Sequence, residues 1–119
     1  MGFGSWLARK GSVGGTARAV AKGWKTIKEK NPGMSPKEIA EAYVTVRYLV
    51  TNEQDLAIRV LTNLRVNTRK REPNPLDLSW AIFWEESVKA GDSLTVLEHR
   101  VEWRQIMKEE IEKMGIAAE

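Results

Sequence analysis

Apolar residues recur every three or four positions along most of this chain, and short polar or proline-containing stretches separate the runs. That spacing places apolar side chains on one face of a helix. No segment gives a convincing alternation of apolar and polar residues, as a half-buried strand would. The pattern therefore predicts an all-α protein that folds as a compact bundle of about five helices.

The first thirty residues predict two helical segments that glycines separate. Residues 3–10 form two turns that end at Gly11, and the stretch 11–15, with three glycines, predicts a hinge or a tight turn. Thr16 then caps a helix that runs to about Lys30. The apolar face of that helix consists of Ala17, Val20, Ala21, Trp24 and Ile27.

A capping box marks the start of the next helix. Ser35 stands at the N-cap position and Glu38 follows three residues later, which predicts a helix to about Val50. Its core-facing stripe is expected to contain Ile39, Ala42, Tyr43, Val46, Leu49 and Val50. Thr51 begins a second possible capping box, and a third helix follows to about Leu64. The very short link makes these two helices antiparallel neighbours or places a sharp corner between them.

Two prolines and the lack of any periodicity predict a loop over residues 65–75. A fourth helix then spans roughly residues 76–90. It has little polar surface in its middle, so we expect it to be the central and most buried helix. A long final helix is predicted from Asp92 or Ser93 to about Met114.

A length of 119 residues, with 42% hydrophobic and 29% charged residues, is typical of one soluble domain. We expect residues 1–15 to be a basic, Gly-rich amphipathic arm and residues 16–119 to be a single helical domain. No apolar run approaches the ~20 residues of a transmembrane helix. The absence of cysteine excludes disulfides, thiolate metal sites and cysteine nucleophiles. Since no secretory signal is found, we expect a cytoplasmic protein, although mitochondrial presequences can also be acid-free and amphipathic.

The charge distribution is uneven along the chain. Glu29 is the first acidic residue; residues 1–30 contain seven Lys or Arg and one Glu, a net charge of +6, whereas residues 31–119 have a net charge of −3. Like charges that are kept together repel one another unless a partner neutralises them. The arm is therefore expected to contact something anionic.

We accordingly expect a non-catalytic, small helical accessory or assembly subunit that docks on a larger protein partner or forms a homo-oligomer. Phe3, Trp6 and Leu7 of the arm are the expected anchors. The expected electrostatic contacts are Arg9, Lys10, Arg18, Lys22 and Lys25. In the plainer alternative, residues 16–30 simply pack on the bundle and their lysines are solvated.

Two other partner classes fit the same arm. Nucleic acid would be bound by the arm together with the basic loop 65–71, which contains Arg69, Lys70 and Arg71, provided that both lie on one face. No helix-turn-helix signature supports this alternative, and a solvated loop explains the cluster as well. An anionic membrane surface would accept the aromatic side chains of the arm and attract its cations.

The sequence predicts no catalytic, cofactor-binding or metal-binding residue. His99 is the only histidine, and a lone histidine offers no metal constellation. A helical wheel places Arg100 near the middle of the last apolar stripe, so Glu85 or Glu86 is expected to pair with it, because an isolated buried charge is very costly. Contact with a ligand or partner is the alternative role for Arg100.

Overall fold

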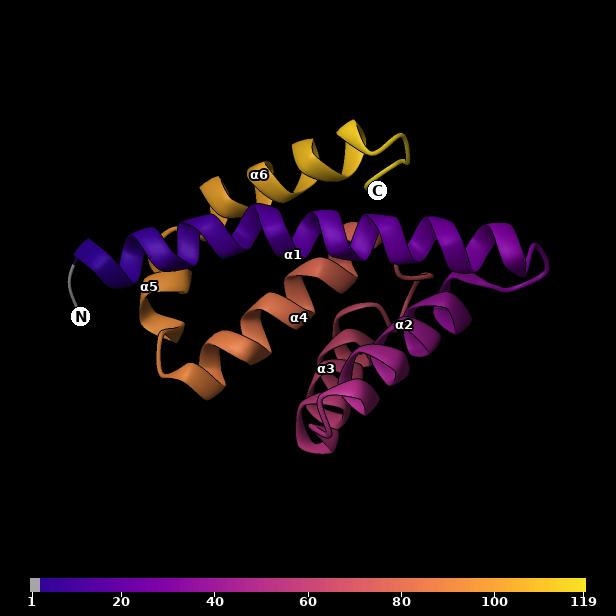
Figure 1. Ribbon diagram of the computed structural model, residues 1–119, viewed down its shortest axis with the longest axis horizontal. Helices are drawn as coiled ribbons and strands as arrows, with labels where there is room; N and C mark the ends of the chain where they lie inside the picture. Colours follow the sequence, from indigo (N-terminus) through magenta and orange to yellow (C-terminus); the bar gives the residue numbers. More distant parts are fainter. Residues whose placement is uncertain (1–2) are drawn as a thin grey trace.

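One long helix, α1 (Phe3–Lys30), extends along the molecule, and the other helices pack against it (Figure 1). In this computed structural model the backbone is described for residues 3–119 and the side chains from Gly11 onward. At 1.5 Å per residue a helix of 28 residues spans about 42 Å, close to the longest dimension of the molecule, 45 Å.

The described part of the chain forms six helices and no strand, which confirms the all-α class. The helices after α1 are α2 (Pro36–Val50), α3 (Gln54–Asn67), α4 (Pro75–Ala90), α5 (Ser93–Glu98) and α6 (Arg100–Lys113). In Figure 1, α6 lies along one side of α1, while α4 and the α2–α3 pair pack on the other side.

The hinge predicted at residues 11–15 is wrong, because α1 continues through them without a break. Val13 is fully buried among residues of α4 and α6. Gly14 is buried within α1, where an added Cβ would meet the flexible end of Arg18 at 3.0 Å and make an ordinary contact of 3.7 Å with Glu110 Cγ of α6. Burial of Val13 outweighs the weak helix propensity of its glycine neighbours.

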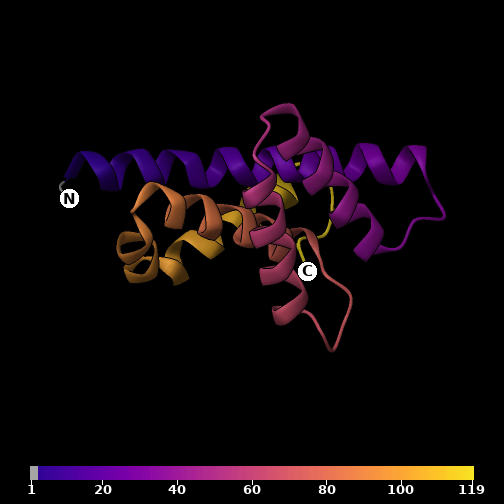
Figure 2. The same ribbon diagram turned by 90° about the horizontal axis from the view of Figure 1, so that it is seen from below.

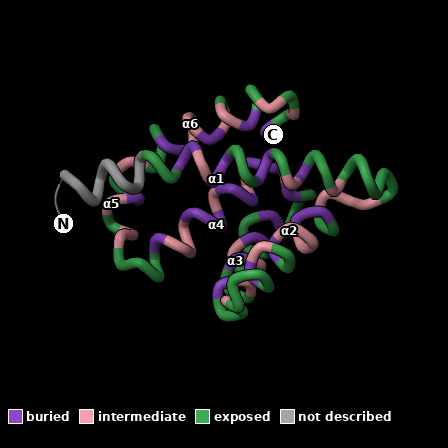
Figure 3. Tube along the Cα trace, viewed as in Figure 1, coloured by how far each residue is buried: buried purple, intermediate pink, exposed green. Residues whose placement is uncertain are grey.

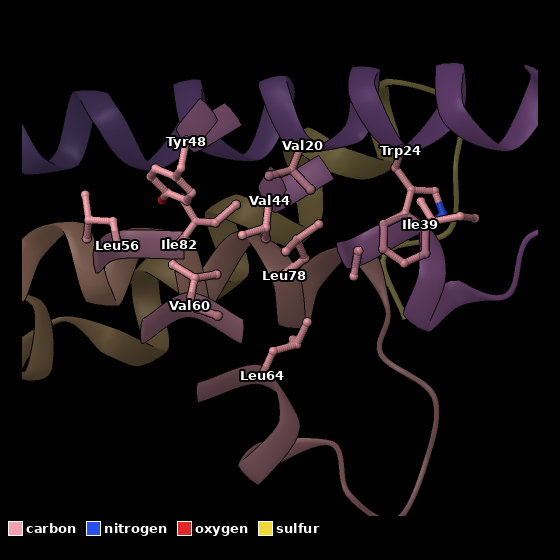
Figure 4. Packing of buried hydrophobic residues seen from close by; sticks show 12 residues of the cluster. Val20, Trp24, Ile39, Val44, Tyr48, Leu56, Val60, Leu64, Leu78 and Ile82 are labelled. Carbon is pink, nitrogen blue, oxygen red and sulfur yellow. The ribbon is translucent and has the colours of Figure 1, made fainter. Parts of the chain in front are cut away.

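Two hydrophobic clusters form the core, and α1 and α4 contribute to both. The first joins α1 and α4 to the α2–α3 pair, and Figure 4 shows Val20 and Trp24 of α1 pointing toward it. The second joins the same two helices to α5 and α6 around Trp103. The prediction that the fourth helix is central is confirmed, since Ala81, Ile82 and Phe83 are all buried.

The expected long final helix is divided at His99, and this explains why the described residues form six helices instead of about five. His99 stands between the last residue of α5 and the first residue of α6, and its ring stacks on Trp103 at 5.4 Å between centroids. Val96 of α5 and Trp103 of α6 are both fully buried. The two helices therefore change direction at His99 while sharing one cluster.

The capping boxes test how well the local sequence predicts where helices begin. The predicted box at Ser35 is present, with its side chain accepting the Glu38 N–H. The box predicted at Thr51 is wrong: Thr51 ends α2, and Asn52 turns the chain with a φ of 55°. A box that the sequence analysis missed starts α4, where Asn74 caps the helix.

Candidate docking site

The cationic face of α1 is defined here as Arg18, Lys22 and Lys25, and all three are exposed. Spacings of three and four residues place them along one side of the helix. The opposite side is fixed on the core, because Val20 and Trp24 are buried. Figure 3 shows that exposed residues dominate the C-terminal half of α1, whereas α4 is mostly buried or intermediate. The helix therefore presents these cations in a fixed orientation.

Arg18 differs from the two lysines, because it already pairs with a carboxylate of another helix. Its guanidinium donates a hydrogen bond of 3.1 Å to Glu110 of α6, and this bond lowers the pKa of the Glu110 carboxyl. Lys22 and Lys25 form no ion pair with any residue whose side chain is described. These two lysines are therefore available to an external anion.

The expected anchors Phe3, Trp6 and Leu7, and the cations Arg9 and Lys10, lie outside the residues whose side chains the structure describes. Their role in docking stays a prediction.

A groove lies between α1 and α2, with a volume of about 450 Å³. We call it the α1–α2 groove; it is lined by Ala19, Lys22, Gly23, Thr26, Ile27, Tyr43, Val46 and Arg47. The two helices approach so closely that a Cβ atom on Gly23 would lie 2.5 Å from Tyr43 Cε2. Val46 is 60% exposed beside the groove, and α2 continues with Leu49 and Val50, which are even more exposed.

This exposed apolar edge corrects the predicted stripe of α2. The buried face is Ile39, Ala40, Val44 and Tyr48, so Val46, Leu49 and Val50 face outward instead of into the core. Because α2 has apolar residues on most of its circumference, its sequence permits two stripes. The second stripe leaves Val46, Leu49 and Val50 as an exposed apolar set on α2.

The basic loop does not join the cationic face of α1. Figure 2 shows the tip of the segment 68–74 pointing away from α1, whereas its end returns to the helix, where Pro73 and Asn74 line a pocket with Lys25 and Lys28. Arg69 and Lys70 of this segment are exposed, whereas Arg71 donates to both carboxylate oxygens of Asp77, one of the bonds being 2.9 Å long. The Asp77 carboxylate raises the pKa of Arg71, and this pair supports the first turn of α4.

The prediction that Glu85 or Glu86 pairs with Arg100 is wrong. Arg100 is exposed at the first position of α6, one turn before the buried Trp103, so it precedes the part of the stripe that reaches the core. Glu86 instead pairs with Arg47 of α2 at 3.1 Å, and Glu85 accepts a bond from Asn63.

The Arg47–Glu86 pair extends into a half-buried network between α2 and α4. The Tyr48 hydroxyl donates to Glu86 at 2.6 Å, and Arg47 donates to the Tyr43 hydroxyl at 3.1 Å. Burial and the bond to Glu86 raise the pKa of Tyr48. Burial lowers the pKa of Arg47, but Glu86, Tyr43 and Tyr48 together outweigh the effect of burial and raise this pKa. At neutral pH Tyr48 stays protonated and Arg47 charged, so the network is a structural crosslink rather than an acid–base pair.

No group of three or more His, Asp or Glu side chains that could hold a metal ion occurs among the described residues. In the same part of the chain, no helix combines the length and apolar character needed to cross a bilayer. His99 Nδ1 lies 3.9 Å from Glu102 on the surface side of the Trp103 stack. Comparison with protein families, with curated proteins and with solved structures finds no match to this chain.

Proposed function

We propose that this protein is a non-catalytic helical accessory or assembly subunit of the cytoplasm, which docks on a larger protein through α1. The observation that carries the proposal is the cationic face: Lys22 and Lys25 are exposed and have no acidic partner among the described side chains, on a helix that the core holds rigidly. Phe3, Trp6 and Leu7 are the proposed anchors, and Arg9 and Lys10 are proposed as further electrostatic contacts.

Rigidity favours this use of α1. Val13 and Ala17 are fully buried, so the helix is held to the body within a few residues of the proposed anchors. A surface that is ordered before binding loses less conformational entropy when a partner arrives. Cations on such a surface steer an acidic partner and set its orientation.

The nucleic-acid alternative requires a second basic surface beside α1. The tip of the segment 68–74 points away from α1 (Figure 2). The guanidinium of Arg71 is engaged by Asp77. These observations favour an acidic protein over a nucleic acid as the partner of α1.

The test is size-exclusion chromatography of the untagged protein from its native lysate at low salt. Residues 2–10 are deleted in one variant, and the deletion stops there because Val13 is buried in the core. A second variant carries Lys22→Glu and Lys25→Glu. The control carries Arg69→Glu and Lys70→Glu, which changes the net charge by the same amount on the segment 68–74.

We expect the full-length protein and the control to elute in a large complex with a protein-like 260/280 nm ratio, and both α1 variants to elute as monomers with nearly unchanged melting temperatures. A full-length protein that elutes alone would contradict the proposal. A high ratio that falls as salt is raised would assign the protein to the nucleic-acid class instead.

A further inference from the structure

The α1–α2 groove has the size and chemistry of a site for apolar side chains. Its volume of about 450 Å³ lies within the range of binding sites in proteins. Ile27, Tyr43 and Ala19 provide apolar walls, and Gly23 contributes no side chain that would fill the space. Apolar groups entering it would be removed from water at little steric cost.

The apolar surface continues along α2 beyond the groove. Val46, Leu49 and Val50 are 60%, 68% and 80% exposed, and they lie within about one turn of one another. One turn is about 5.4 Å, which is also the spacing of side chains at positions i and i+4 of a second helix. A partner helix can therefore place one side chain in the groove and the next against Leu49 and Val50.

The charged residues that line the groove indicate the charge of the partner helix. Lys22 and Arg47 are the charged residues that line the groove, and no carboxylate lines it. Arg47 is already paired with Glu86, so Lys22 is the charge that remains for a partner. A second copy of this chain docked by the same surface would bring Lys22 close to the cationic face of its neighbour. An acidic segment would instead neutralise it.

We infer that the α1–α2 groove binds an acidic amphipathic helix of the partner protein. Apolar side chains at positions i, i+4 and i+7 of that helix pack in the groove on Tyr43 and Val46 and beyond it on Leu49 and Val50. A carboxylate beside them pairs with Lys22. The inference rests on the proposed function and names the element of the partner that contacts this subunit.

The probes are three synthetic 18-residue helical peptides, titrated into the ¹⁵N-labelled full-length protein by NMR. The first has leucine at the i, i+4 and i+7 positions and glutamate on the flanks. The second replaces each glutamate by lysine, and the third replaces each leucine by alanine. We expect the first peptide to shift the amide signals of Lys22, Gly23, Tyr43 and Val46, and the other two to bind at least about tenfold more weakly.

Two variants and a matched control sharpen the test. Val46→Glu places a carboxylate at the groove and should abolish binding of the first peptide. Lys22→Glu should reverse the preference, so that the lysine peptide binds better than the glutamate peptide. Val66→Glu makes the same change at a residue of α3 with nearly equal exposure, 59% against 60%, and should bind like the unmodified protein.

Three outcomes would overturn the inference: no shifts at millimolar peptide, shifts that map away from the groove, or equal binding of the acidic and basic peptides. The lysate chromatography separates this failure from failure of the proposed function. If only the groove assignment is wrong, Val46→Glu elutes in the large complex as the full-length protein does. If the proposed function is wrong, the full-length protein itself elutes alone.

Discussion

At the scale of single residues, Trp103 is packed but incompletely satisfied. Its ring meets Phe83 edge-on at 5.6 Å between centroids and stacks on His99. Among buried atoms of the described side chains, its Nε1 is the one without a hydrogen-bond partner. A buried donor without a hydrogen-bond partner destabilises a fold by about 1–3 kcal/mol. The packing of the Trp103 ring therefore stabilises the protein, while its unpaired N–H destabilises it.

This predicts a mild effect for Trp103→Phe. The smaller ring loses contacts, but the substitution also removes the unpaired N–H, so we expect a loss of about 1 kcal/mol or less in the free energy of unfolding. Trp103→Ala, which loses the ring altogether, should cost about 3–5 kcal/mol. Urea denaturation of both variants measures the difference. A loss near 3 kcal/mol for Trp103→Phe would contradict this expectation.

At the scale of the helices, glycine positions on α1 have opposite surroundings. Gly23 lies against Tyr43 at the crossing of α1 and α2, where an added Cβ would overlap the ring. Gly11 and Gly15 have nothing within 4 Å of an added Cβ. The same residue type thus allows close helix packing at one place and only weakens the helix at the others.

Alanine substitutions test both roles. Gly23→Ala should lower the free energy of unfolding by about 1–2 kcal/mol, because overpacking against Tyr43 exceeds the gain of about 1 kcal/mol in helix propensity. Gly15→Ala should raise it by about 0.5–1 kcal/mol, corresponding to a few degrees in melting temperature. Thermal melts followed by circular dichroism measure both. If Gly15→Ala were destabilising, the result would favour the predicted hinge at residues 11–15 over a continuous helix.

At the scale of the whole molecule, ion pairs join elements that are distant in sequence. Lys89 at the end of α4 donates to Glu53 before α3 at 3.1 Å, and Arg18 of α1 pairs with Glu110 of α6. The Glu53 carboxylate raises the pKa of Lys89, and the bond from Lys89 lowers the pKa of Glu53. The Ser35 backbone N–H likewise lowers the pKa of Glu38.

These shifts contribute to the pH dependence of stability. Lowered carboxyl pKa values stabilise the fold above the ordinary value of 4.5, and this contribution is lost as the pH falls through the lower folded-state values. The raised pKa of Lys89 stabilises the fold below 10.5, and that contribution is lost as the pH rises further. The melting temperature should therefore be nearly constant between about pH 5 and 10 and decline on both sides.

Glu53→Gln should flatten this profile at both ends, because it removes one lowered carboxyl and the partner of Lys89. Melting curves at intervals from pH 2 to 12 measure the profile, with Glu112→Gln, at an exposed position on α6, as the matched control. An unchanged profile for Glu53→Gln would show that the Glu53–Lys89 pair does not affect stability.

The sequence by itself determined the helical class, most helix boundaries and the uneven charge. The helical class and the boundaries depend on residues within one or two helical turns of one another. Examples are the apolar spacing, the capping box at Ser35 and Gly91, which ends α4. The stripe of α3 could also be predicted, because Leu56, Val60 and Leu64 offer one apolar face. Local signals failed at Thr51, where the backbone turn through Asn52 leaves the threonine at the end of α2.

Only the tertiary structure decided which face of α2 is buried, whether α1 passes through its glycines, and which cation pairs with Glu86. In each case the local sequence is compatible with more than one outcome. Burial of Val13 keeps α1 continuous, and burial of Val44 and Tyr48 turns Val46 outward and brings Arg47 to Glu86. The free energy of such contacts depends on the area that neighbouring helices remove from water, and no single segment contains that information.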